Sequence, residues 1–134
     1  MGRDVHGKLF WGFPVDSEDV TRGDDTLFLS EGAYYLPAKG IPEPQSKDYT
    51  SPEWDAWRKQ CETVPGVVRL YGYGDEVKHF VAVKESYFDS EWGEMTKLPD
   101  LAVKDHWEAT LRDFCETLNI PWREPGWHLT SLYF

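Results

Sequence analysis

The order of apolar segments along the chain limits the folds that it can adopt. A short apolar and aromatic run, Lys8–Phe13, precedes a helical pattern, two runs rich in β-branched residues, a second helical pattern and a last apolar run. This β-α-β-β-α-β order predicts an α+β fold with a four-stranded antiparallel sheet and two helices on one face, as in ferredoxin-like folds. At 134 residues the chain has the length of one domain, residues 1–134.

The two helices carry the clearest local signals. Ser51-Pro52 supplies a helix start, because a serine hydroxyl can accept a bond from an unpaired N–H and proline fits the first helical position. Apolar residues then recur at spacings of three and four across Trp54–Val64. The same periodicity runs through Val103–Leu118, and we expect Asn119 to terminate this second helix.

Three further strands are predicted besides the first. Val67–Tyr73 and Val77–Val83 are rich in β-branched and aromatic residues, and Gly74-Asp75 between them fits a tight hairpin turn. The last strand, Trp127–Phe134, follows a turn that contains proline and glycine.

A long insertion, residues 14–50, separates the first strand from the first helix. It is rich in proline, glycine and charged residues, which favours loops. Within it, Thr26–Leu29 and Ala33–Leu36 flank Ser30-Glu31-Gly32, so the segment 26–36 is predicted to form a hairpin that can extend the sheet.

Acidic residues dominate the charge of the chain. The 24 acidic and 14 basic residues give a net charge of −10, which disfavours direct binding to nucleic acid or to an anionic membrane and favours basic partners. Eleven carboxylates fall in two predicted loops, six in Asp16–Glu31 and five in Glu85–Asp100. The spacing from Asp16 to Leu27 does not match a calcium-binding loop.

We predict that these two loops form contact patches for a basic protein, with aromatic anchors among the carboxylates. The predicted partner-binding residues are Asp16, Glu18, Asp19, Asp24, Asp25, Tyr87, Asp89, Glu91, Trp92 and Glu94.

The sequence contains no motif that identifies an enzyme. Nucleophile elbow, phosphate-loop, dinucleotide-binding and zinc-protease patterns are absent, so we predict no catalytic residues and no cofactor. The four histidines lack the spacing of metal ligands, and no metal site is predicted. Cys61 and Cys115 are expected to be reduced, packed thiols. Lys78–Val83 lacks the glycine and aromatic pattern of RNA-recognition strands.

These observations favour a non-enzymatic, cytoplasmic binding protein that occupies a basic surface of a partner, such as the nucleic-acid groove of another protein. Its small size and acidity resemble, by analogy, the inhibitors and nucleic-acid mimics that phages use against host defence. No apolar run is long enough to span a membrane, and no membrane association is expected.

Two alternatives stay open. The first is a small-molecule-binding or catalytic domain with a pocket between the sheet and the long insertion, lined by Trp11, Tyr34, Tyr35 and Trp127. The second is a homo-oligomer in which the last strand or the 26–36 hairpin pairs across a two-fold axis.

Overall fold

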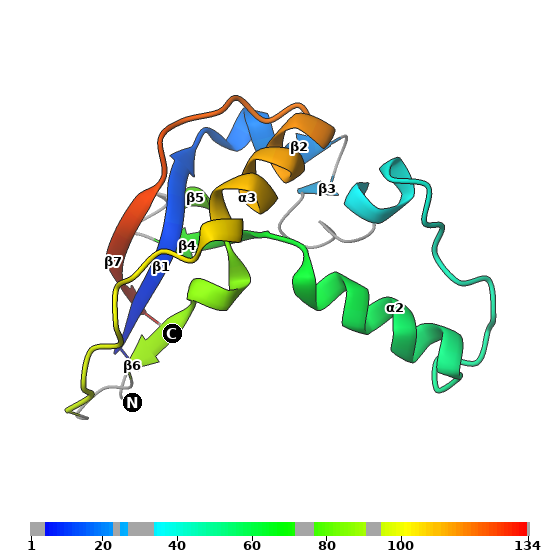
Figure 1. The fold of residues 1–134 in the computed structure, drawn as a ribbon, viewed down its shortest axis with the longest axis horizontal. Helices are drawn as coiled ribbons and strands as arrows, with labels where there is room; N and C mark the ends of the chain where they lie inside the picture. The colour runs from blue at the N-terminus through cyan, green and yellow to red at the C-terminus, as the bar shows by residue number, and fades with distance from the viewer. Residues whose placement is uncertain (1–4, 23–24, 27–33, 72–76, 91–94, 134) are drawn as a thin grey trace.

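The computed structural model of the chain describes residues 5–22, 25–26, 34–71, 77–90 and 95–133. This part of the chain has an α+β fold with an antiparallel sheet of five strands (Figure 1). Its three α-helical segments are residues 34–38, 52–63 and 105–117. A separate two-stranded ribbon pairs β2 (Thr21–Arg22) with β3 (Asp25–Thr26). The α+β class predicted from the sequence is therefore confirmed.

The central strand of the sheet is β1 (Val5–Val15). Along one side it pairs with β7 (Gly126–Tyr133). Along the other side its first half pairs with β6 (Phe88–Ser90) and its second half with β5 (Val77–Ala82), beyond which lies β4 (Gly66–Tyr71). Four strands were expected, and β6 is the fifth, inside a segment that was predicted as an acidic loop.

A row of small residues crosses the sheet. Gly66 is paired with Ala82, Ala82 with Gly12, and Gly12 with Gly126. A Cβ atom on Gly12 would lie 1.9 Å from the carbonyl oxygen of Val81, so only glycine allows this close approach. The two outer strands β4 and β7 touch although β5 and β1 lie between them, which means that the sheet is strongly curled.

Both faces of the sheet are packed. Side chains of α3 (Asp105–Thr117), among them Leu111 and Phe114, meet Trp11 and Phe13 of β1 in the main core. A smaller cluster on the opposite face contains Phe10, Val68, Phe80 and Ala82. Alternate residues of β1 thus enter the two clusters, as strand geometry requires.

The ends of α3 follow from its sequence. The backbone of Asn119 is left-handed, with φ of 58°, and Ile120 N–H donates to the Cys115 carbonyl over 2.8 Å. This is a Schellman-type ending, so the predicted termination at Asn119 is confirmed. At its other end the helix begins at Asp105, and Val103, which was predicted as part of its apolar face, is exposed in the preceding segment.

The first long helix, α2 (Pro52–Thr63), begins where the sequence predicted. The Ser51 side chain makes no capping bond, however, and its buried hydroxyl has no partner in the described part of the chain. Figure 1 shows α2 extending away from the sheet, and Trp57 is the one buried residue of this helix. The helix therefore joins the core through a limited contact, whereas we expected it to lie across the sheet.

The 14–50 insertion has more regular structure than predicted. It contains the 3-10 helix η1 (Ser17–Val20), the β2–β3 ribbon and a helical turn at residues 34–38. The prediction that the second arm of the 26–36 hairpin is a strand is wrong, because residues 34–36 are helical. Residues 27–33 lie outside the described residues. The predicted turn Gly74-Asp75 also lies outside them. No helix in the described ranges is long and apolar enough to cross a bilayer.

Candidate functional site

The candidate site is a groove beside an extended segment, residues 95–104, which we call the strap. The 3-10 helix η2 (Lys84–Ser86) and β6 form one wall, the strap forms the other, and Trp107 and Trp127 contribute aromatic surface. The groove has a volume of about 370 Å³. Its lining consists of Glu85, Ser86, Tyr87, Phe88, Pro99, Asp100, Ala102, Lys104, Trp107 and Trp127.

A buried serine explains why η2 interrupts the strand that runs beside β1. Ser86 Oγ accepts a hydrogen bond from Trp11 N–H over 2.8 Å and donates to the Val83 carbonyl over 2.5 Å. The Val83 N–H in turn donates to the Trp11 carbonyl over 3.1 Å. The Ser86 hydroxyl thus accepts the hydrogen bond that a backbone carbonyl of a neighbouring strand would otherwise accept from β1. Because the β1 backbone stays hydrogen-bonded, the chain can leave the sheet between β5 and β6, and Glu85 lies in this outward turn.

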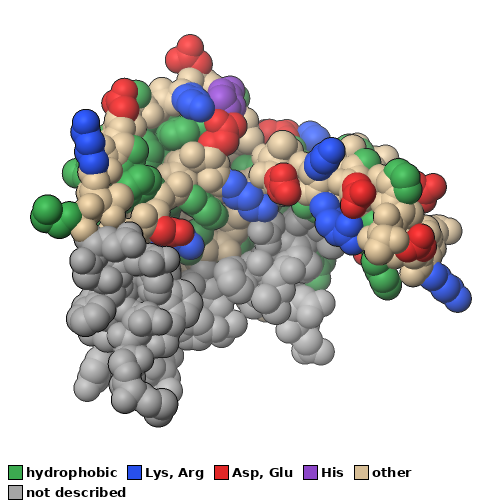
Figure 2. Space-filling model, turned by 90° about the horizontal axis from the view of Figure 1, so that it is seen from below, with side chains coloured by type: hydrophobic (Ala, Val, Ile, Leu, Met, Phe, Trp, Pro, Cys, Tyr) green, Lys and Arg blue, Asp and Glu red, His purple; other side chains and the backbone are tan. Residues whose placement is uncertain are grey.

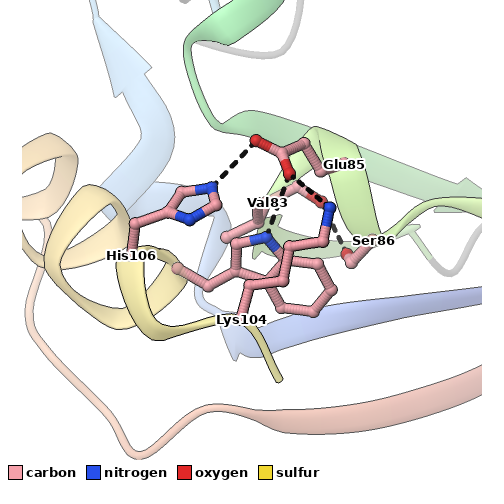
Figure 3. A network of polar contacts seen from close by, with 6 residues as sticks. Val83, Glu85, Ser86, Lys104 and His106 are labelled. Atoms are coloured by element: carbon pink, nitrogen blue, oxygen red, sulfur yellow. Dashed lines mark hydrogen bonds and ion pairs between the residues drawn. The ribbon is translucent and has the colours of Figure 1, made fainter. Parts of the chain in front are cut away.

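Glu85 is the centre of a polar network that ties η2 to the start of α3 (Figure 3). His106 Nε2 lies 3.0 Å from one carboxylate oxygen, and Lys104 Nζ lies 3.3 Å from the other. The Trp107 indole N–H donates to the same carboxylate over 3.4 Å. The hydrogen bond with His106, then that from Trp107, lowers the pKa of Glu85 to about 2. The Glu85 charge is therefore satisfied within the chain.

Three tryptophans from distant parts of the sequence support the groove. The ring centroid of Trp107 lies 5.8 Å from that of Trp11 and 5.8 Å from that of Trp127. The Trp127 indole N–H donates to the Leu101 carbonyl over 2.8 Å, so the strap is anchored to the last strand. This arrangement orients the strap relative to the sheet.

The strap carries several exposed apolar side chains. Asp100, Ala102 and Lys104 line the groove, whereas Leu101 and Val103 between them do not, and all five residues are exposed to solvent. The exposed large hydrophobic side chains of the strap are Met95, Leu98, Leu101 and Val103. In Figure 2 hydrophobic side chains gather at the sheet end of the molecule, while side chains of both charges cover the arm formed by α2.

The structure does not bring the two predicted acidic patches together. One patch, with Asp16, Glu18 and Asp19, follows the end of β1. Asp89 of the other patch lies on β6 and is paired with Lys8, in the first half of β1. Eight residues of strand separate positions 8 and 16, which corresponds to roughly 26 Å at about 3.3 Å per residue. Asp16 also forms an ion pair with Arg123 over 3.3 Å.

The other predicted partner-binding residues have different positions. Tyr87 lines the groove, and its ring lies under the Lys8 ammonium at 5.4 Å. Asp89 alternates with the groove-lining Phe88, so it lies on the opposite face of the sheet. Asp25 belongs to β3. The residues outside the described ranges are Asp24, Glu91, Trp92 and Glu94.

The residues predicted to line a single ligand pocket separate into two groups. Trp11 and Trp127 are paired in the register of β1 and β7 and meet at Trp107. Tyr34 and Tyr35 belong to the 34–38 helical turn, and the Tyr35 ring lies 5.6 Å from that of Phe114. The four aromatic residues therefore do not surround one cavity.

A second polar cluster joins the insertion to α3. The Tyr35 hydroxyl donates to Asp113, and Lys39 Nζ lies 2.9 Å from the other carboxylate oxygen of Asp113. Burial and the neighbouring carboxylate raise the pKa of Tyr35 to about 12, while the Tyr35 and Lys39 hydrogen bonds lower the pKa of Asp113. No local sequence pattern marks this cluster, because Tyr35 and Lys39 lie 78 and 74 residues from Asp113 in the sequence.

The histidines and cysteines have separate environments. His79 Nδ1 lies 3.0 Å from Ser17 Oγ, and the His128 ring packs against those of Phe10 and Phe80. Among the described side chains no group of three potential ligands could hold a metal ion. Burial raises the pKa of the Cys115 thiol to about 12, which disfavours the reactive thiolate.

No protein-family model, curated protein or solved structure matches the chain. The strap groove is therefore interpreted from its own residues. The strap was not predicted, because the residues up to Asp100 were interpreted as an acidic loop and Val103 as the start of the second helix. The apolar residues in Leu-Pro-Asp-Leu-Ala-Val were the signal that could have identified it.

Proposed function

We propose that this chain is a non-enzymatic protein-binding domain whose strap contacts a basic segment of a partner protein. The observation that carries the proposal is the position of the exposed apolar side chains. Four of the seven large hydrophobic residues that are exposed in the described ranges lie on the ten-residue strap. Single exposed hydrophobic residues are ordinary, but a concentration of them on one segment is typical of an interaction surface.

Charge supports a basic occupant. Glu85 is already paired with Lys104 and His106, whereas Asp100 forms no ion pair within the described ranges. Among the described residues its carboxylate accepts one hydrogen bond, from the backbone N–H of Ala102 over 3.2 Å. A lysine or arginine of the partner can pair with Asp100, while apolar residues next to it in the partner cover Leu98 and Leu101. The net charge of −10 steers such a partner toward the chain.

The partner class includes proteins whose basic surface otherwise binds nucleic acid, and the chain would then act as an inhibitor or a nucleic-acid mimic. The separation between Asp16 and Asp89 favours a contact through one segment over a continuous acidic face. We therefore assign the binding role to the strap and leave residues 16–20 outside the contact.

The groove itself supports a second candidate, a small aromatic or apolar ligand. Its volume of about 370 Å³ is within the range of small-molecule sites, and Trp107 and Trp127 offer stacking surface. A thermal-shift screen distinguishes the candidates, since a ligand that binds the native state raises the melting temperature.

The test uses a fluorescent peptide of alternating lysine and leucine as the probe, with a lysine-serine peptide of equal charge for comparison. Leu98→Ser removes an apolar strap side chain that is 65% exposed, and the matched control Tyr49→Ser removes one that is also 65% exposed, outside the strap. Asp100→Lys reverses a charge beside the groove, and Glu43→Lys makes the same change elsewhere.

We expect the lysine-leucine peptide to bind more tightly than the lysine-serine peptide, and added salt to weaken it. Leu98→Ser and Asp100→Lys should each weaken binding by about tenfold, while the two controls stay within about twofold. Equal losses in the strap variants and the controls would mean that only net charge attracts the peptide, and the proposal would then be wrong.

The ferredoxin-like relation also stays a proposal. Without β6, the strand order of the sheet is β4-β5-β1-β7 with antiparallel neighbours. This pairing supports the relation, and an experimental structure that includes residues 27–33 and 72–76 would test it.

A further inference from the structure

The last strand, β7, lies at an edge of the sheet that the described strands form. In the described part of the chain β7 pairs with β1 alone, from Val5 to Gly12 of that strand. The curl of the sheet does not close this edge, because β4 begins at the row of Gly12 and extends along the other half of β1. We infer that the two outer strands meet near Gly66 and Gly126, and no other strand among the described residues pairs with the outer side of β7.

This edge lacks the features that usually prevent edge-to-edge pairing. Natural edge strands are blunted by charged residues, proline or short length. β7 spans eight residues, Gly126–Tyr133, and contains no proline and no charged Asp, Glu, Lys or Arg, although 38 of the 134 residues of the chain are of these charged types. Leu129 in its middle is 73% exposed.

We propose that β7 pairs antiparallel with β7 of a second copy of the chain, so that two sheets join across a two-fold axis. An antiparallel pair of identical strands is self-complementary, and it closes after two copies. With the axis near Leu129, the exposed leucines of the two copies cover each other.

Charge favours a second copy over the basic partner at this edge. The basic segment proposed for the strap would find no carboxylate on β7 to pair with. Two chains of net charge −10 repel each other, and an uncharged strand is the place where they can approach at the lowest electrostatic cost. Salt should therefore strengthen dimerisation by screening the repulsion, whereas it should weaken the strap contact.

Light scattering during size exclusion tests the proposal, over protein concentrations from about 10 µM to about 1 mM, a range suited to a small interface. We expect the mass to rise from 15.6 kDa toward twice that value, and to rise further with added salt. Leu129→Lys should keep the chain monomeric throughout. The matched control Tyr49→Lys, at a similarly exposed apolar residue, should dimerise like the unmodified chain.

Hydrogen exchange of the β7 amides gives the second measurement. In the dimer, outward-facing amides of residues 126–133 should exchange more slowly as concentration rises, while those of β5, which is paired on both sides, should not change. A chain that stays monomeric at all concentrations, or that still dimerises with Leu129→Lys, would overturn the proposal. Open-ended oligomers would overturn the closed pair. None of these results bears on the strap, whose test uses other residues.

Discussion

Individual polar side chains hold together segments that are far apart in the sequence. Ser86 connects η2 to the backbone of β1, Glu85 connects it to the start of α3, and Tyr35 connects the insertion to Asp113 on the same helix. Each of these hydrogen bonds replaces hydrogen bonds to water at polar groups that folding brings together. The wall of the groove therefore depends on a few specific hydrogen bonds as well as on the apolar core.

The Glu85 network should make stability depend on pH. The folded-state pKa of Glu85 is about 2, below the ordinary value of 4.5, so its contribution is complete above about pH 4.5 and is lost as the pH falls toward 2. The side chains of His106 and Glu85 are 57% and 51% exposed, and screening by solvent at this exposure limits the effect to about 1 kcal/mol. We expect Glu85→Gln to lower the melting temperature at pH 7 but not at pH 2. An equal difference at both pH values would contradict this role.

The Tyr35 hydroxyl should stabilise the fold through Asp113. Tyr35→Phe removes the donor and should cost about 1 kcal/mol in unfolding free energy. The raised pKa of about 12 means that this contribution persists below about pH 10 and is lost as the pH rises toward 12. The neighbouring variant Tyr34→Phe is the control and should change stability by less than about 0.5 kcal/mol. Denaturant unfolding at pH 7 measures both, and equal effects would remove the assigned role.

At the scale of elements, the curled sheet places the site. The row of Gly66, Ala82, Gly12 and Gly126 lets the strands bend around the smaller cluster that contains Phe10 and Phe80. The break between β5 and β6 falls just after this row, and η2 with Glu85 occupies the break. The curl and the groove wall are thus parts of one arrangement.

Replacing Gly12 should be far more costly than replacing Gly126. An alanine Cβ at Gly12 would lie 1.9 Å from the Val81 carbonyl oxygen and 2.7 Å from Ala82 Cα, both backbone atoms that cannot move independently. We expect Gly12→Ala to cost about 3 kcal/mol. No atom within 4 Å opposes a Cβ at Gly126, so Gly126→Ala should be neutral within about 0.5 kcal/mol. Comparable losses in thermal unfolding would refute the close-approach explanation.

Local sequence patterns predicted the long elements well. The periodicity of α3 and the β-branched residues of β4 and β5 act over neighbouring positions, so they can be read directly. β6 was not predicted because a strand of three residues, Phe88–Ser90, is too short to show an alternation of apolar and polar residues. The 34–36 arm was predicted as a strand from its tyrosines, but contact of Tyr35 with Phe114 and Asp113 favours a helical turn there. Hydrogen bonds between side chains that are distant in the sequence, such as that of Tyr35 with Asp113, leave no local pattern from which they could be predicted.

At the scale of the whole molecule, charge and apolar exposure occur in different places. Acidic residues are spread over both ends of β1 and along α2, whereas exposed apolar side chains concentrate on the strap. We interpret the net charge as a source of long-range attraction and the strap as the contact surface. The uncharged β7 edge is the second contact surface that we propose, for another copy of the chain.

Two tryptophan indoles provide the most direct test of the strap as the contact surface. Trp127 N–H is bonded to the Leu101 carbonyl of the strap, and Trp54 N–H is bonded to the Ser46 carbonyl beside α2. We propose to titrate the lysine-leucine peptide into ¹⁵N-labelled protein while recording the indole resonances. If the strap is the contact surface, we expect a saturable shift of the Trp127 resonance with the Trp54 resonance unchanged. A saturable shift of Trp54 with Trp127 unchanged would contradict it.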